Sequence, residues 1–174
     1  MGMLDASSLS GYVGTHLDGL IGMDLLGEFM LTFVRGELYV DEDVRDVDFL
    51  DLTTEVVMGL PVIQMEVNGH RVKMFVDTGA KISYLTPAYL EGCAVEEVLS
   101  DFYPLIGRYT VEVSTLSGHL NGWSVLARFA RPPAMVNMTL MMTGTDGIMG
   151  SDLFDSYYVR IGRGGQPVAI NPHI

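Results

Sequence analysis

The amino-acid sequence predicts an all-β fold. Short runs of strand-forming residues recur between turn-forming residues, 20 of the 174 residues are glycines, and one pair of runs has the pattern of a β-hairpin. Glycine serves tight turns because it adopts backbone conformations that other residues avoid. The predicted strands cover residues 62–67, 71–76, 109–116, 123–130 and 136–142.

The clearest element is the hairpin predicted over residues 61–76. Apolar and polar residues alternate in both of its runs, as in strands that bury one face. Asn68 and Gly69 stand between the runs, and both accept the positive φ angles that a two-residue type I′ turn requires. The second run leads directly into Asp77, so we expect a buried strand to hold this carboxylate rigidly.

Composition excludes several classes of protein. Apolar residues make up 48% of the chain and charged residues 18%, which rules out a disordered chain. The net charge of −12 argues against binding to nucleic acid, which needs a basic surface. No apolar run is long enough to predict a membrane span, and the one cysteine and four histidines lack the spacing of a zinc site. No signal peptide is recognisable at the N-terminus, so we expect a cytoplasmic location.

Part of the sequence occurs twice, at a spacing of 128 residues. Residues 15–29 read THLDGLIGMDLLGEF, and residues 143–157 read TGTDGIMGSDLFDSY. In each copy an Asp-Gly pair is followed by two apolar residues, a glycine and then Asp-Leu. We interpret this as a duplication whose first copy keeps only the back end of the repeat. The acidic residues 41–51 between the copies indicate a solvated linker.

Two motifs resemble those of one protein family. The segment VKMFVDTGAKISYL, residues 72–85, resembles the active-site segment of retropepsin-like aspartic proteases, in which an apolar strand is followed by Asp-Thr/Ser-Gly-Ala and a return strand. Ile148-Met149-Gly150 resembles the family's second motif, two apolar residues and a glycine before a short helix. Residues 101–118 fall where the family has its flap, the hairpin that covers the substrate.

The resemblance implies a β-rich acid-protease fold, a closed barrel-like lobe with one short helix per repeat. It divides the chain into a partial retropepsin-like repeat over residues 1–45, an acidic linker over residues 46–59 and a complete unit over residues 60–174. The implied active-site loop consists of the catalytic Asp77 with Thr78, Gly79 and Ala80 in support, and the flap candidates are Ile106, Gly107 and Arg108.

The activity that the resemblance implies is hydrolysis of an extended polypeptide with apolar residues at the cleavage site. Two aspartates share one proton and activate a water molecule, so neither a metal nor a cofactor is implied. This chain has one Asp-Thr-Gly sequence, and a two-fold homodimer would place Asp77 opposite its own copy. A second lobe outside this chain would supply the partner equally well. A worn motif at Asp5 fits poorly, because only 13 residues separate it from Asp18.

One departure from the family pattern is Lys81, which stands where the family usually has a small or acidic residue. A lysine near the carboxylate pair would favour its ionised forms. Lys81 and the partial first repeat also fit an alternative function, in which the chain is a catalytically inactive protease-fold module that binds peptides or proteins.

Overall fold

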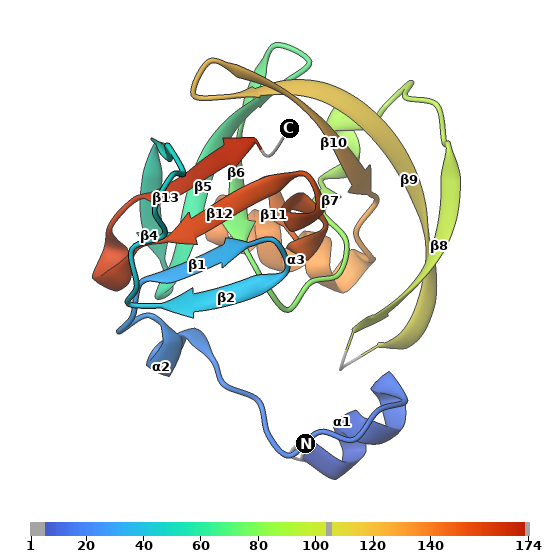
Figure 1. Ribbon diagram of the computed structural model, residues 1–174. Helices are drawn as coiled ribbons and strands as arrows, with labels where there is room; N and C mark the ends of the chain where they lie inside the picture. The colour runs from blue at the N-terminus through green and yellow to red at the C-terminus, as the bar shows by residue number, and fades with distance from the viewer. Residues whose placement is uncertain (1–5, 104–105, 173–174) are drawn as a thin grey trace.

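The computed structural model describes residues 6–103 and 106–172, which form two β-sheets (Figure 1). One sheet has five strands and the other has eight. In spatial order the five-stranded sheet contains β2 (Glu37–Val40), β1 (Leu31–Val34), β12 (Tyr157–Ile161), β13 (Val168–Pro172) and β3 (Leu50–Asp51). The eight-stranded sheet contains β4 (Thr54–Val57), β5 (Leu60–Val67), β6 (His70–Val76), β11 (Gly147–Met149), β7 (Tyr84–Leu85), β10 (Trp123–Ala130), β9 (Gly107–Leu120) and β8 (Glu97–Tyr103).

The eight-stranded sheet closes on itself through a further pairing between β5 and β9. Glu66 lies opposite His119 and Val67 opposite Gly118 at this junction. The two backbones approach so closely that a Cβ atom at Gly118 would lie 2.3 Å from the carbonyl oxygen of Glu66. Only glycine fits there, and the closure confirms the expected barrel-like lobe.

The predicted hairpin is confirmed as β5 and β6, with Asn68 and Gly69 in the turn. Their φ angles are 50° and 78°, as a type I′ turn requires. The alternation also holds, because Met65, Val72 and Met74 are at most 3% exposed. The main core joins the two sheets: it includes these three side chains together with Leu31, Val159 and Phe129.

The segment expected as a linker, residues 46–59, takes part in both sheets. Its β3 pairs with β13, and its β4 pairs with β5. Leu52, between these strands, is 3% exposed and belongs to the main core. Acidic residues dominate this stretch, but the apolar residues among them are enough to anchor it between the two sheets.

One predicted strand is wrong, because residues 136–142 lie in the helix α3 (Ala134–Thr143). Val136 and Leu140, one helical turn apart, are buried against Val62 and Phe75 of the eight-stranded sheet. Pro133 precedes the helix, and Gly144, with φ at 66°, ends it. The remaining helical elements are α1 (Ala6–Val13), α2 (Met23–Leu26) and the 3-10 turns η1 (Pro87–Tyr89), η2 (Ser151–Asp155) and η3 (Arg163–Gly165).

Figure 1 shows α1 at the end of an extended segment, away from both sheets. None of the helices in the described part of the chain has the length and apolar character needed to cross a membrane.

Candidate active site

The Asp-Thr-Gly turn begins where β6 ends. Val76, the last strand residue, is 5% exposed in the core, whereas Asp77 is exposed. The backbone amide of Asp77 donates to the carbonyl oxygen of Met149 over 3.0 Å, and the amide of Gly79 donates to Oδ1 of Asp77 over 2.9 Å. The carboxylate is therefore oriented by its own turn, on a strand that the core holds in place.

The two sequence motifs meet in space. β11, which carries Ile148 and Met149, lies between β6 and β7, so that Met149 is opposite Val76. The next residue, Gly150, packs against the backbone that follows the Asp-Thr-Gly turn: a Cβ atom there would lie 2.8 Å from the carbonyl oxygens of Ala80 and Ile82. This contact explains why the second motif ends in glycine.

The amide and the hydroxyl of Ser151 strengthen the same junction, since both donate to the carbonyl oxygen of Ala80, over 2.8 and 3.1 Å. The loop from Asp77 to Ala80 is thus attached to the segment 148–151 at both of its ends. Thr78, in the middle of the loop, is exposed.

A buried brace, which we did not anticipate from the sequence, supports both motifs. Ser83 is 2% exposed, and its hydroxyl accepts from the amide of Gly150 over 3.0 Å and donates to Oδ1 of Asp152 over 2.6 Å. The amide of Ser83 donates to Oδ2 of Asp152 over 3.1 Å. Burial raises the pKa of Asp152, and its hydrogen bonds with Ser83 oppose that shift. A serine within an apolar strand signals a polar partner, but nothing local identifies residue 152.

The expected flap residues lie at the end of the long hairpin formed by β8 and β9, which curves away from the rest of the sheet in Figure 1. Gly107 is opposite Tyr103 and has a φ angle of 88°, which favours glycine. Ile106 and Arg108 are both exposed. Residues 104 and 105 lie outside the described part of the chain.

A hydrogen-bonded cluster attaches this hairpin to β7. The hydroxyl of Tyr84 donates to the carboxylate of Asp101 on β8 and lies 2.9 Å from the hydroxyl of Tyr109 on β9. Oδ1 of Asp101 accepts from the amide of Phe102 over 2.8 Å. Burial raises the pKa of both Tyr84 and Tyr109, so both hydroxyls keep their protons near neutral pH.

An apolar surface adjoins the Asp-Thr-Gly turn. Phe75, Ile148 and Tyr84 lie side by side on β6, β11 and β7, with Ile148 opposite each of the other two. The side chain of Tyr103, at the end of β8, packs against the same cluster as Phe75. Side chains of this kind are suited to contact apolar groups of a bound polypeptide.

Lys81 is exposed and lies four residues after Asp77. Among the described residues, no second carboxylate is hydrogen-bonded to Asp77. Over the same residues, no group of three or more histidine, cysteine, aspartate or glutamate side chains is arranged to hold a metal ion.

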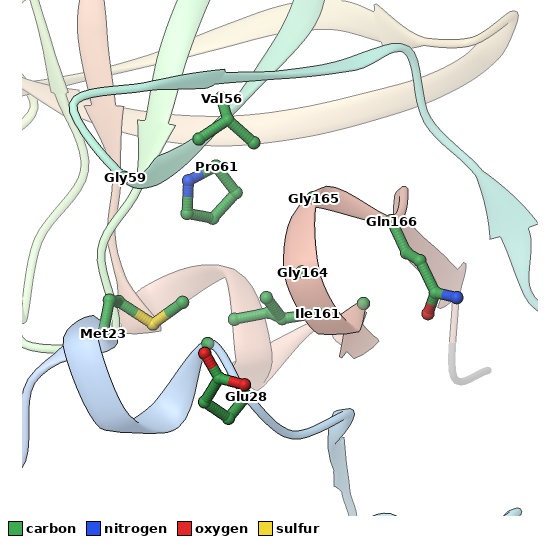
Figure 2. A pocket seen from close by; sticks show the side chains of 11 residues that line it. Met23, Glu28, Val56, Gly59, Pro61, Ile161, Gly164, Gly165 and Gln166 are labelled. Carbon is green, nitrogen blue, oxygen red and sulfur yellow. The ribbon is translucent and has the colours of Figure 1, made fainter.

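The most distinct pockets lie elsewhere. Figure 2 shows one of about 380 Å³ between α2, the turn joining β4 to β5, and η3; its lining residues include Met23, Glu28, Pro61, Ile161 and Gln166. A second, of about 510 Å³, lies by β1 and β2. Asp77 lines neither pocket, as expected if its surroundings form only one wall of a cleft.

Comparison with known proteins gives one family and several similar structures. The model of the "gag-polyprotein putative aspartyl protease" family matches residues 63–155, more than half of the chain. A retropepsin-like aspartic protease from Rickettsia conorii matches with a TM-score of 0.50 and 15% identity, over 76% of this chain and 98% of that one.

Two viral proteases match less of the chain. The simian foamy virus (mac) protease is 19% identical over 52% of this chain and 88% of its own, with a TM-score of 0.40. The EIAV protease, in complex with the inhibitor HBY-793, is 17% identical over 59% of this chain and 92% of its own, with a TM-score of 0.41. None of the curated proteins matches significantly. The likeness to the Rickettsia protein confirms the acid-protease fold.

Proposed function

The chain belongs to the retropepsin-like aspartyl protease family, and on that premise we propose that it is an aspartic endopeptidase in which Asp77 supplies one carboxylate of the catalytic pair. The observation that carries this proposal is the position of Asp77. It is exposed at the end of a buried strand, and the amide of Gly79 orients its carboxylate. An exposed carboxylate held in one orientation is what general base catalysis on a water molecule requires.

The reaction needs a second carboxylate. When two carboxylates lie a few Å apart, their repulsion raises one pKa and lowers the other, so that the pair shares one proton. The ionised member takes a proton from water as the water attacks the peptide carbonyl carbon. The protonated member donates a hydrogen bond to the carbonyl oxygen and supplies the proton for the leaving amine. No metal or cofactor enters these steps.

The substrate that fits is an extended polypeptide with apolar side chains next to the cleaved bond. Phe75, Ile148 and Tyr84 form an apolar surface beside the Asp-Thr-Gly turn, and the hairpin of β8 and β9 packs against this surface. The two ways to complete the site are a second copy of this chain in a homodimer and a separate second lobe.

A second candidate function is peptide or protein binding without hydrolysis. It is favoured by one observation: no other carboxylate of the described residues is hydrogen-bonded to Asp77. A lone aspartate in the same fold would keep the apolar surface but could not share a proton with a partner.

Digestion of a peptide library by the full chain at pH 4–7 tests the proposal. We expect Asp77→Asn to abolish cleavage while it keeps a side-chain oxygen for the amide of Gly79. Asp43→Asn, at an exposed position of the acidic segment, is the matched control and should cleave like the wild type. Equal cleavage by the Asp77→Asn variant, or none by any form of the chain, would refute the peptidase function.

A further inference from the structure

The pairing of β1 with β12 relates the two copies of the repeated segment by a local two-fold axis. Thr32 lies opposite Arg160, the residue 128 positions later. Leu31 lies opposite Ile161, and Phe33 opposite Val159. Moving each residue to its equivalent in the other copy exchanges these last two pairs. The axis therefore passes between Thr32 and Arg160.

The segment before β1 has the same backbone structure as its copy before β12. Gly22 has φ and ψ of −93° and 176°, and Gly150 has −87° and −178°. The amide of Leu25 donates to the carbonyl oxygen of Gly22 over 3.1 Å, and the amide of Leu153 donates to that of Gly150 over 3.2 Å. The first copy is thus folded as in a complete lobe.

Burial is what separates the two copies. Ile21 is 62% exposed, whereas its equivalent Met149 is 1% exposed. Leu25 is 53% exposed, whereas its equivalent Leu153 is 7% exposed. Met149 is buried because β6 and β7 flank β11 on both sides. Residues 19–22 pair with no strand in the part of the chain that the structure describes.

We propose that residues 19–26 are the docking site for the front half of a second lobe, which means a hairpin whose second strand ends in Asp-Thr-Gly, followed by its return strand. This proposal rests on the proposed function, since it names the source of the second aspartate. The incoming strands would flank residues 19–21 as β6 and β7 flank β11. The two-fold axis would then relate the incoming aspartate to Asp77.

Two observations define the partner. Asp24 is exposed, whereas its equivalent Asp152 binds the amide and the hydroxyl of Ser83. The incoming return strand should therefore carry a hydroxyl side chain six residues after its aspartate, as Ser83 follows Asp77. The exposed Leu20 and Ile21 require apolar side chains from the same strands.

A second copy of this chain does not fit the site. Its β6 and β7 already flank its own β11, so they have no free edge for residues 19–21. Both edges of its β12 are also occupied, one by β1 and the other by β13. The partner is therefore a lobe that lacks a closing strand of its own.

The test joins residues 46–142 of this sequence, as the front half, ahead of the intact chain. The offset of 128 residues places this segment where it can pair with residues 19–21. We expect amide hydrogen exchange over residues 19–26 to slow by at least tenfold relative to the chain alone, and the product to be a monomer. Unchanged exchange would overturn the proposal, and so would a homodimer of the chain alone that protects residues 19–26.

Urea unfolding of two variants gives a second measurement. Ile21→Ser should leave the unfolding midpoint of the chain alone unchanged but lower that of the joined chain. Leu126→Ser, at a position 69% exposed on β10, is the matched control and should have no effect in either. An equal effect of Ile21→Ser in both contexts would contradict docking. Peptide cleavage by the joined chain is measured separately: slowed exchange without cleavage would refute the peptidase function and leave the docking site standing.

Discussion

Replacing Ser83 with alanine should destabilise the active-site loop more than any change at an exposed serine. The substitution leaves the buried amide of Gly150 without its acceptor at 3.0 Å, which costs about 1–3 kcal/mol. It also removes the hydroxyl that donates to Asp152 over 2.6 Å, a bond that contributes about 1–2 kcal/mol. We expect a loss of roughly 3 kcal/mol in the free energy of unfolding.

Urea unfolding at pH 7 measures this loss. With a denaturant dependence of about 2 kcal/mol per M, the unfolding midpoint should fall by about 1.5 M. Ser124→Ala, at an exposed position on β10, is the matched control and should change the free energy by no more than about 0.5 kcal/mol. If the two variants unfold at the same urea concentration, the hydrogen bonds of Ser83 do not support the loop.

The pH dependence of stability provides a separate test of the same brace. Burial raises the pKa of Asp152 in the folded state above its ordinary value, so the folded protein binds more protons than the unfolded chain between the two pKa values. The contribution of this group to stability is therefore largest at low pH and falls as the pH rises through that interval. Asp152→Asn cannot ionise, and we expect it to flatten this part of the stability curve; an unchanged slope would contradict the raised pKa.

Three further variants test the rest of the site. Gly150→Ala places a Cβ atom 2.8 Å from backbone carbonyl oxygens and should cost about 1–3 kcal/mol by thermal unfolding; an unchanged melting temperature would contradict the close approach. Lys81→Ser removes a positive charge near the carboxylate pair and should move the acid limb of the pH–activity profile to higher pH, whereas an unchanged profile would show that the charge has no influence. Tyr84→Phe removes a donor to Asp101 and should speed amide exchange in β8 but not in β12; equal rates would mean that the cluster does not hold the hairpin.

The hairpin and the Asp-Thr-Gly turn could be predicted because their signals are local. Asn68 and Gly69 specify a turn through their own backbone preferences, and the alternation beside them specifies the buried face. The strand predicted over 136–142 failed for the same reason in reverse. Its apolar and polar residues alternate from Val136 to Leu140, but a spacing of four residues between these two also suits a helix.

The sequence by itself determined the all-β class, the hairpin that ends at Asp77, the second motif at 148–150 and the duplicated segment, because each depends on residues close together in the chain. Only the tertiary structure decided what those segments contact. Ser83 meets Asp152 across 69 residues, and Thr32 meets Arg160 across 128. Contacts at such separations depend on how the sheets close and pack, which no local pattern records. The same packing buries Met149 but leaves Ile21 exposed, although both lie in copies of one motif.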